Sequence, residues 1–143
     1  MTEVQALLDR IILRLKQQDA FSGVRFLREY SAEAVETPVR VMTAAVCLAG
    51  LERGKGYLGG IVAPSLRGEC YSVKADILVY APHGENGSGL SELVGKLITG
   101  LEAADEERLI TETSAGSIEF DADMNAVFRR VSFGMELCLC REE

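Results

Sequence analysis

Residues 50–60, GLERGKGYLGG, place a lysine among glycines, a composition that can bring backbone amides and an ammonium group around a phosphate. A phosphate-binding loop of this kind needs four residues between its first two glycines, followed by Lys and a Ser or Thr that holds magnesium. Here Gly50 and Gly54 enclose three residues, and Gly56 stands where the hydroxyl is required. The stretch is therefore interpreted as a turn, because glycine readily adopts the positive φ that turns need.

The single histidine, His83, lies in a glycine-rich loop beside Glu85, where a base and an orienting acid could meet. Ser88 follows in the same loop. No Gly-x-Ser-x-Gly elbow surrounds it, so it is interpreted as the cap of the next helix. Two hypotheses stay open for this loop: a plain connection, or the site of a small cytoplasmic ligand-binding domain or enzyme.

Two groups of residues resemble metal-binding motifs, but neither matches the pattern that its motif requires. Cys138 and Cys140 flank one residue, unlike the Cys-x-x-Cys pairs of zinc sites. Residues 121–125, DADMN, begin like a calcium loop, but Ala126 replaces the required Gly and Ser132 stands where the bidentate Glu belongs. We therefore expect no metal and no other cofactor.

The net charge limits which kinds of partner are expected. The chain has 15 Lys and Arg against 22 Asp and Glu, a formal net charge of -7. An acidic surface repels phosphate, so we expect no sequence-specific binding of nucleic acid. No apolar run is long enough to cross a membrane, and the first residues carry no basic secretion signal, so we expect a cytoplasmic protein without membrane partners.

Chain length and cysteine content complete this picture. A chain of 143 residues fits one domain, spanning residues 1–143, with a core of its own. In a reducing cytoplasm the cysteines are predicted to be buried or half-buried thiols. They are Cys47, Cys70, Cys138 and Cys140.

Two amphipathic helices are predicted from apolar residues at helical spacing. The first covers residues 3–17 and begins at a capping box formed by Thr2 and Gln5. The second begins near residue 90 and carries an apolar stripe made of Leu90, Leu93, Val94, Leu97, Ile98 and Leu101. The acidic run after it, residues 102–107, is interpreted as a solvated helix end.

Period-two patterns predict long strands. Residues 39–53 are apolar on both faces beyond residue 42, as in a central strand covered on two sides, and residues 69–81 alternate with one wetter face. Residues 117–121 and 127–140 form a late hairpin around the turn at 121–125. The predicted fold is α+β, a mostly antiparallel β-sheet with two amphipathic helices packed on one face and a long β-hairpin arm.

Two regions are candidate interaction surfaces. The arm, residues 53–68, is longer than an ordinary hairpin loop and carries apolar side chains at Tyr57, Leu58, Ile61 and Val62. On the last strand Arg129 falls on the apolar side and Phe128 on the polar side, where an exposed aromatic beside arginines is typical of protein interfaces. The alternative is an edge-strand pair with no partner.

The order of elements resembles that of the tail terminator, or tail completion, proteins of long-tailed bacteriophages and prophages. The order is helix, strand, long strand, glycine-rich arm, strand ending in YAP, glycine-rich loop, amphipathic helix, then SIEFDADMNAVFRRVSFGMEL. The segment VKADILVYAP and the late hairpin, from Phe120-Asp121 to Phe128-Arg129-Arg130, carry most of the likeness. The resemblance covers most of the chain and depends on pattern and order.

The resemblance implies a structural, non-enzymatic subunit that assembles into a ring, usually six-fold, on the finished tail tube. Such a ring stops tail growth and presents a surface to the head. The implied partners are copies of the chain itself, the tail tube protein and the head connector protein. The implied location is the host cytoplasm during assembly and then the virion tail. The alternatives are another head–tail joining or minor tail protein, and the enzyme or ligand-binding domain that uses the His83 loop.

Overall fold

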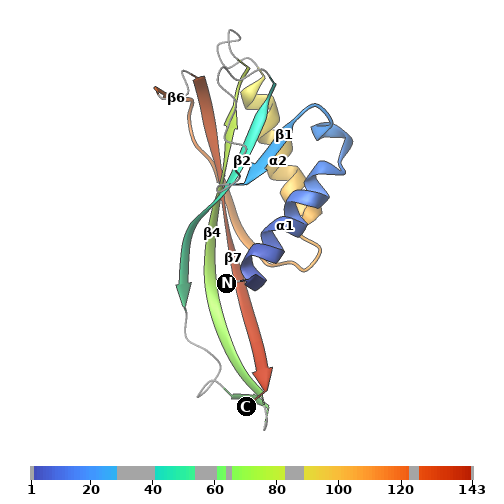
Figure 1. The fold of residues 1–143 in the computed structure, drawn as a ribbon, viewed down its shortest axis with the longest axis vertical. Helices are drawn as coiled ribbons and strands as arrows, with labels where there is room; N and C mark the ends of the chain where they lie inside the picture. Colours follow the sequence, from blue (N-terminus) through green and yellow to red (C-terminus); the bar gives the residue numbers. More distant parts are fainter. Residues whose placement is uncertain are drawn as a thin grey trace.

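The computed structural model describes residues 2–28, 41–53, 61–63, 66–82, 89–122 and 126–142. Two α-helices, one short 3-10 helix and seven strands make up the described part (Figure 1). In chain order they are α1 (Thr2–Lys16), η1 (Asp19–Phe21), β1 (Arg25–Arg28), β2 (Thr43–Arg53), β3 (Ile61–Ala63), β4 (Leu66–Tyr80), α2 (Leu90–Ala104), β5 (Ile110–Ala115), β6 (Glu119–Asp121) and β7 (Ala126–Glu142).

The strands join in one mixed sheet of order β1-β2-β4-β7-β5, with β3 added to β4 and β6 added to β7. All pairings are antiparallel except that of β1 with β2, which is parallel. The predicted α+β fold with a mostly antiparallel sheet is confirmed. The late hairpin is confirmed as well, since β6 pairs with β7 from Glu119↔Phe128 to Asp121↔Ala126.

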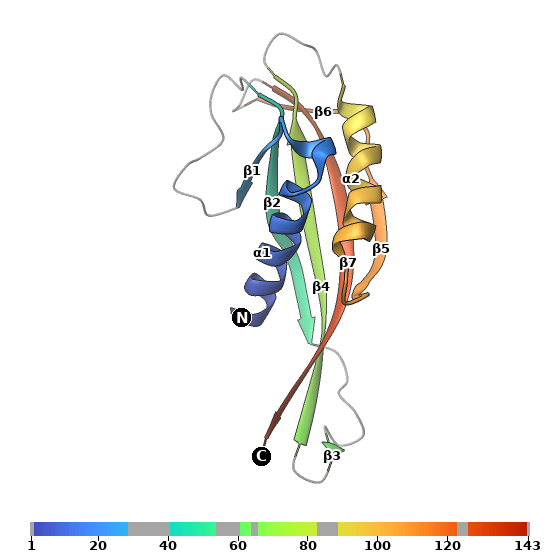
Figure 2. The ribbon, with the colours of Figure 1, turned by 90° about the vertical axis from the view of Figure 1, so that its right-hand side faces the viewer.

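Both helices cover the same face of the sheet (Figure 2). The apolar stripes of α1 and α2 are buried in one hydrophobic core, together with the alternate residues of β4 that face them. That periodicity is the reason for the arrangement, because a one-sided helix and a one-sided strand each remove their apolar face from water by packing together. The fully buried contacts include Leu7, Leu15, Leu97, Ile77 and Val79.

A glycine permits the close approach of α2 to the segment that follows α1. A Cβ on Gly100 would lie 2.8 Å from Cε2 of Phe21 and 2.9 Å from Oε1 of Gln18. The Gln18 side chain also donates a hydrogen bond from Nε2 to the Gly100 carbonyl at 3.1 Å. The first turn of α2 differs from expectation, because its cap is Gly89 at φ 84 with no side-chain hydrogen bond, and Ser88 lies outside the described residues.

β4 and β7 are the longest strands and stay paired from Tyr80↔Phe128 to Leu66↔Glu142. β2 accompanies β4 only as far as Arg53↔Tyr71. Beyond that point β4 and β7 continue as a narrow ribbon, joined by β3, and extend past both helices (Figures 1 and 2). We call this ribbon, formed by residues 61–63, 66–70 and 138–142, the arm. Of the predicted arm, residues 61–63 and 66–68 lie in this ribbon, residues 54–60, 64 and 65 lie outside the described residues, and β7 contributes a strand that was not predicted to belong to it.

The prediction that β2 is covered on two sides beyond residue 42 is wrong for its second half. β1 pairs with β2 only from Thr43 to Val46, and further along the strand Leu48 and Leu51 are 36% and 37% exposed. The apolar pattern of β2 continues, while the described elements that cover it end. An apolar run of this kind indicates either burial or an interaction surface.

The expectation of four reduced cysteines is wrong for Cys70, which is disulfide-bonded. Its backbone position explains how a bond can form, because the register of β4 and β7 places Cys138 directly opposite Cys70. Directly opposite residues of antiparallel strands have Cα atoms roughly 4.5–5.5 Å apart, within the range that disulfides span. Cys47, on β2, is a half-buried thiol.

No helix in the described ranges is both long enough and apolar enough to cross a membrane.

Candidate functional site

The turn from α2 to β5 is built around a buried carboxylate. Asp105 is 7% exposed, and its backbone N–H closes the last turn of α2 on the Leu101 carbonyl at 3.0 Å. Its side chain accepts hydrogen bonds from the backbone N–H groups of Leu109 at 2.8 Å and Ile110 at 2.9 Å. Asp105 therefore fixes where β5 begins. The interpretation of residues 102–107 as a solvated helix end is wrong at this position.

Arg108 occupies the strained position of the same turn. Its φ is 58°, in the left-handed region, and its backbone N–H donates to the Asp105 carbonyl at 3.2 Å. Chains usually place glycine after a helix in this conformation, because a Cβ there costs roughly 1–2 kcal/mol. The Arg108 guanidinium makes no hydrogen bond or ion pair with any residue in the described ranges.

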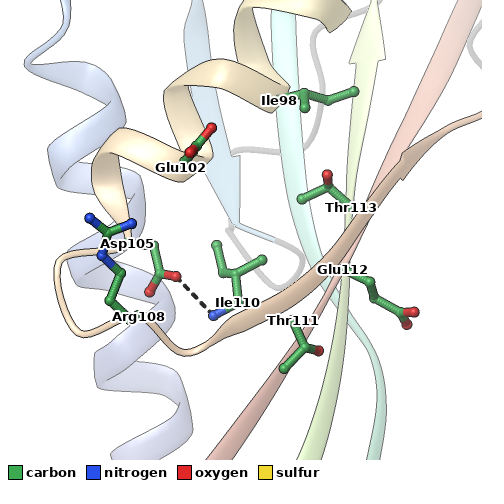
Figure 3. Close-up of a pocket in the computed structure, with 8 residues that line it drawn as sticks. All are labelled: Ile98, Glu102, Asp105, Arg108, Ile110, Thr111, Glu112 and Thr113. Carbon is green, nitrogen blue, oxygen red and sulfur yellow. Dashed lines mark hydrogen bonds between the residues drawn. The ribbon is translucent and has the colours of Figure 1, made fainter.

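A cavity of about 370 Å³ opens beside this turn, between the last turns of α2 and β5 (Figure 3). α2 contributes Ile98 and Glu102, the turn contributes Asp105 and Arg108, and β5 contributes residues 110–113. Because the Asp105 oxygens are occupied by backbone N–H groups, the carboxylate that remains on the α2 side belongs to Glu102. The Glu112 side chain lies over Gly134 of β7 and points away from α2 (Figure 3). We call this cavity, with the outer edge of β5, the α2–β5 groove.

The chemistry of the groove is that of a binding surface. On the α2 side it offers the Arg108 guanidinium, the Glu102 carboxylate and the Thr113 hydroxyl, while the Thr111 hydroxyl donates to the Gly134 carbonyl at 3.3 Å. The described residues that line it include no histidine, cysteine or serine. In the described ranges, no three His, Cys, Asp or Glu side chains come close enough together to hold a metal ion.

β5 forms one boundary of the sheet beside the groove (Figure 2). It pairs with β7 on one side, and none of the described strands pairs with its other side. A register shift between Ile110 and Glu112 marks a bulge at Thr111, and residues 111–115 are exposed. An edge strand presents backbone N–H and C=O groups outward, and these can pair with an added strand.

A cluster of ion pairs holds α1 against the α2–β5 turn. Arg14 binds Glu107 through two oxygens, with Nη1 to Oε2 at 2.8 Å and Nη2 to Oε1 at 3.2 Å. Arg14 also donates to the Ala104 carbonyl at 3.0 Å, where the helix leaves carbonyls without internal partners. Arg10 lies 3.5 Å from Glu107, and Glu106 lies 3.3 Å from Arg14.

The Arg14–Glu107 pair shifts the pKa of both groups. The hydrogen bond from Arg14 lowers the Glu107 pKa from 4.5 to about 2, helped by a backbone hydrogen bond and by the charges of Arg14 and Arg10. The same hydrogen bond, with the neighbouring carboxylates, raises the pKa of Arg14. Both groups stay charged at neutral pH, so the pair fixes the position of the turn and does not exchange protons in that range.

Phe128 is not the exposed aromatic that the sequence predicts. It is 8% exposed, and its ring packs against Tyr80 with the ring centroids 5.3 Å apart. Phe128 and Tyr80 belong to a small apolar cluster that also contains Ala45 and Ala126. The reason is the register of the sheet, because Tyr80 lies directly opposite Phe128 on the neighbouring strand.

Tyr80 connects this cluster to β6. Its hydroxyl donates to Oδ2 of Asp121 at 3.3 Å. Burial, followed by the charge and hydrogen bond of Asp121, raises the pKa of Tyr80 to about 12. The phenol therefore stays neutral and acts as a hydrogen-bond donor within the fold.

Arg129 lies on the apolar side of β7, as predicted, and is half-buried. Its Nε donates to the Gly116 carbonyl at 2.8 Å and its Nη1 to the Ser91 hydroxyl at 2.7 Å. These contacts join β7 to the first turn of α2 and to the β5–β6 connection. Most of the guanidinium is used inside the subunit, and the predicted interface role of Arg129 stays a prediction.

The structure does not bring the predicted site residues together. Ile61 and Val62 lie in β3, at the arm, while Tyr57 and Leu58 fall outside the described residues. The loop with His83 and Glu85 is also outside them. Phe128 and Arg129 lie at the opposite end of the β4–β7 ladder from the arm.

Sequence reasoning missed the groove because its key residues sit within an acidic run. Asp105 had a usable signal, since it directly follows the last apolar residue of a helix and stands four residues before a new apolar segment. Arg108 had none. Positive φ at a non-glycine residue depends on the surrounding turn and leaves no mark in the sequence.

No protein-family model matches the chain, and no curated protein is significantly similar to it.

Proposed function

We propose that the protein is a structural subunit that assembles into a ring at the end of a bacteriophage tail, as tail terminator proteins do. The observation that carries this proposal is the shape of the sheet. A helix-covered body continues into a narrow arm of β4, β7 and β3, and a different boundary of the same sheet, β5, is exposed beside the α2–β5 groove (Figure 2).

A closed ring requires two different patches on every subunit, because each copy contacts one neighbour through one patch and the next neighbour through the other. The arm and the β5 edge are two such patches. They differ in composition, since the arm carries the apolar candidates Ile61 and Val62 whereas β5 is polar. The exposed Leu48 and Leu51 add apolar surface on β2 next to the arm.

The net charge of -7 agrees with a ring through which DNA passes without adhering. The resemblance in element order supports the same role. Another head–tail joining or minor tail protein would use the same surfaces. The enzyme or ligand-binding alternative depends on the loop with His83, which lies outside the described residues.

Assembly of the purified chain tests this proposal. Native mass spectrometry and negative-stain electron microscopy should show closed rings at high protein concentration. Replacing Tyr57→Asp and Leu58→Asp together should leave monomers with an unchanged circular dichroism spectrum, because charges on an apolar contact oppose its desolvation.

The matched control for these variants is Leu13→Asp, which adds the same charge at an exposed apolar side chain of α1, 56% exposed and outside both patches. It should assemble like the unmodified chain. Monomers of the unmodified chain at all concentrations, also in the presence of the tail tube, would contradict the proposed role. Rings of the Tyr57/Leu58 variant would remove these two residues from the interface.

A further inference from the structure

Arg108 is the residue that local folding does not explain. Its backbone adopts a conformation for which glycine is the favoured residue, and its guanidinium binds nothing in the described ranges. Strained residues persist where the surrounding structure imposes them, and they gather at binding and switch sites. The cost of this arginine is therefore explained if its side chain contacts a partner.

Arg108 lies beside an edge where an extended segment can dock. The α2–β5 groove is bounded by a helix on one side and by the exposed edge of β5 on the other (Figure 3). A helix beside an open sheet edge is the setting in which many domains bind an extended peptide as an added strand, with backbone hydrogen bonds for affinity and side-chain contacts for specificity.

We infer that the α2–β5 groove binds the end of β7, residues 138–142, of a second copy of this chain. Because the second copy belongs to the proposed ring, this pairing rests on the proposed function and names its subunit contact. The segment lies in the arm, where β7 extends past both helices and is already in strand conformation (Figure 1).

Charge complementarity is the reason to propose residues 138–142 as the segment that binds in the groove. The segment reads CLCRE and ends with Arg141 and Glu142. Glu102 on the α2 side and Glu112 on the opposite face of β5 are the carboxylates available to the arginine, and Arg108 is the cation available to the glutamate. A guanidinium and a carboxylate can form paired hydrogen bonds, which fix the register of an added strand as well as its affinity.

The β5 edge also carries features that disfavour pairing with strands of other sequences. A bulge at Thr111 and the charge of Glu112 are devices that edge strands use against random strand addition. A strand without matching charges would leave Arg108, Glu102 and Glu112 without partners in a desolvated contact. The groove is therefore expected to discriminate by charge order as well as by strand propensity.

A labelled peptide of residues 136–142, with Cys138→Ser and Cys140→Ser to prevent oxidation, tests the pairing by fluorescence anisotropy on the full chain. The peptide should bind. Arg108→Gly should weaken binding by about tenfold or more, since one partner of a charge pair is removed. A peptide with Arg141→Glu and Glu142→Arg should bind the unmodified chain at least about tenfold more weakly.

The Arg108→Gly variant also separates binding from folding. Its melting temperature should be unchanged or raised, because glycine accepts the backbone conformation, while binding is lost. A second variant, Arg108→Glu, should bind the charge-swapped peptide more tightly than the original peptide. This reversal of preference cannot arise from a loss of fold.

Three results would overturn the inference: no binding of the peptide, equal binding by Arg108→Gly, or equal binding of the swapped peptide. The outcome is separable from that of the proposed function. Rings that form normally with Arg108→Gly would refute this contact and leave the ring intact. Peptide binding without ring formation would support the contact and refute the ring.

Discussion

Asp105 and Arg108 stand three residues apart in the turn that ends α2, and they have opposite effects on stability. Asp105 places a buried carboxylate under the backbone N–H groups of Leu109 and Ile110, which would otherwise be unsatisfied. Arg108 adopts a backbone conformation that an L-residue avoids. Asp105 therefore stabilises the turn, whereas Arg108 exposes a charged group beside it.

Removing the Asp105 carboxylate should destabilise the fold. In Asp105→Ala the two backbone N–H groups lose a charged acceptor at a buried position, so the free energy of unfolding should fall by about 2–4 kcal/mol. Asp105→Asn keeps one carbonyl oxygen of similar shape and should lose about half as much. Urea denaturation measures both. An unchanged midpoint for the alanine variant would show that other groups satisfy the turn.

Replacing Arg108 should have the opposite sign. Arg108→Gly removes the unfavourable Cβ contact but adds flexibility to the unfolded chain, so the free energy of unfolding should rise by at most about 1 kcal/mol. Arg108→Ala is the matched control, because it keeps the Cβ and loses only the guanidinium. Its free energy of unfolding should stay close to that of the unmodified chain. A loss above about 2 kcal/mol in either variant would assign Arg108 a structural role.

The Glu107 pKa predicts how stability changes with pH. The folded pKa of about 2 lies below the ordinary value of 4.5, so folding favours the charged form. This stabilisation is present above pH 4.5 and is lost as the pH falls from 4.5 towards 2. The unfolding midpoint of the unmodified chain should therefore exceed that of Glu107→Gln at pH 7, and the difference should disappear across this window.

The control for this titration is Glu106→Gln. Glu106 also contacts Arg14, but its side chain is 69% exposed against 34% for Glu107. Its substitution should change the midpoint little at any pH, since exposed ion pairs contribute little. A pH-independent difference between the unmodified chain and Glu107→Gln would contradict the assigned cause of the pKa shift.

At the scale of elements, the sequence predicts the secondary structure of each segment better than its tertiary neighbours. The helices predicted at 3–17 and from residue 90 are observed at Thr2–Lys16 and Leu90–Ala104, and the strands at 39–53 and 69–81 are observed at Thr43–Arg53 and Leu66–Tyr80. Apolar periodicity specifies these elements because it records which face must leave water.

The apolar periodicity of a strand does not indicate which neighbouring element packs against each of its faces. The apolar pattern of β2 continues to Leu51, yet Leu48 is 36% exposed where Val46 is 5% exposed. The described pairing with β1 reaches Val46. Phe128 shows the reverse case, since a residue on the polar face is buried by Tyr80 from the adjacent strand. The parallel pairing of β1, the Cys70 disulfide and the α2–β5 groove likewise depend on tertiary register that no local pattern contains.

Two glycines of α2 give a matched test of helix packing. Gly95 has no atom within 4 Å of the position that a Cβ would take, whereas Gly100 faces Phe21 at 2.8 Å. Gly95→Ala should raise the free energy of unfolding by about 0.5–1 kcal/mol through helix propensity alone. Gly100→Ala gains the same propensity but forces Phe21 aside, and should lower the free energy of unfolding by about 1–3 kcal/mol.

Thermal and urea unfolding of both variants measure this difference. Comparing the two variants cancels the effect of helix propensity, because both replace glycine by alanine in the same helix. Equal stabilisation by both substitutions would show that Phe21 and Gln18 move aside without cost. The observed contact between η1 and α2 would then not contribute to the fold.

At the scale of the whole molecule, the sheet joins a helix-covered body to a projecting arm and ends at an exposed strand. These features provide the projecting arm and the receiving groove that the proposed head-to-tail ring requires. Two copies related by a two-fold axis would have to make this contact twice, each arm in the groove of the other copy. A contact made once between neighbouring copies predicts a closed ring or an open filament, and a two-fold dimer by reciprocal arm exchange would contradict the proposed ring.

The most direct test of the proposed role is to delete the gene from its parent genome, induce any resident prophage and image the lysate by electron microscopy. The account predicts tails of abnormal length or tails without heads. A plasmid copy of the unmodified gene should restore normal particles, and the Arg108→Gly gene should not. Normal infectious particles from the deletion strain would contradict the proposed role as a tail terminator.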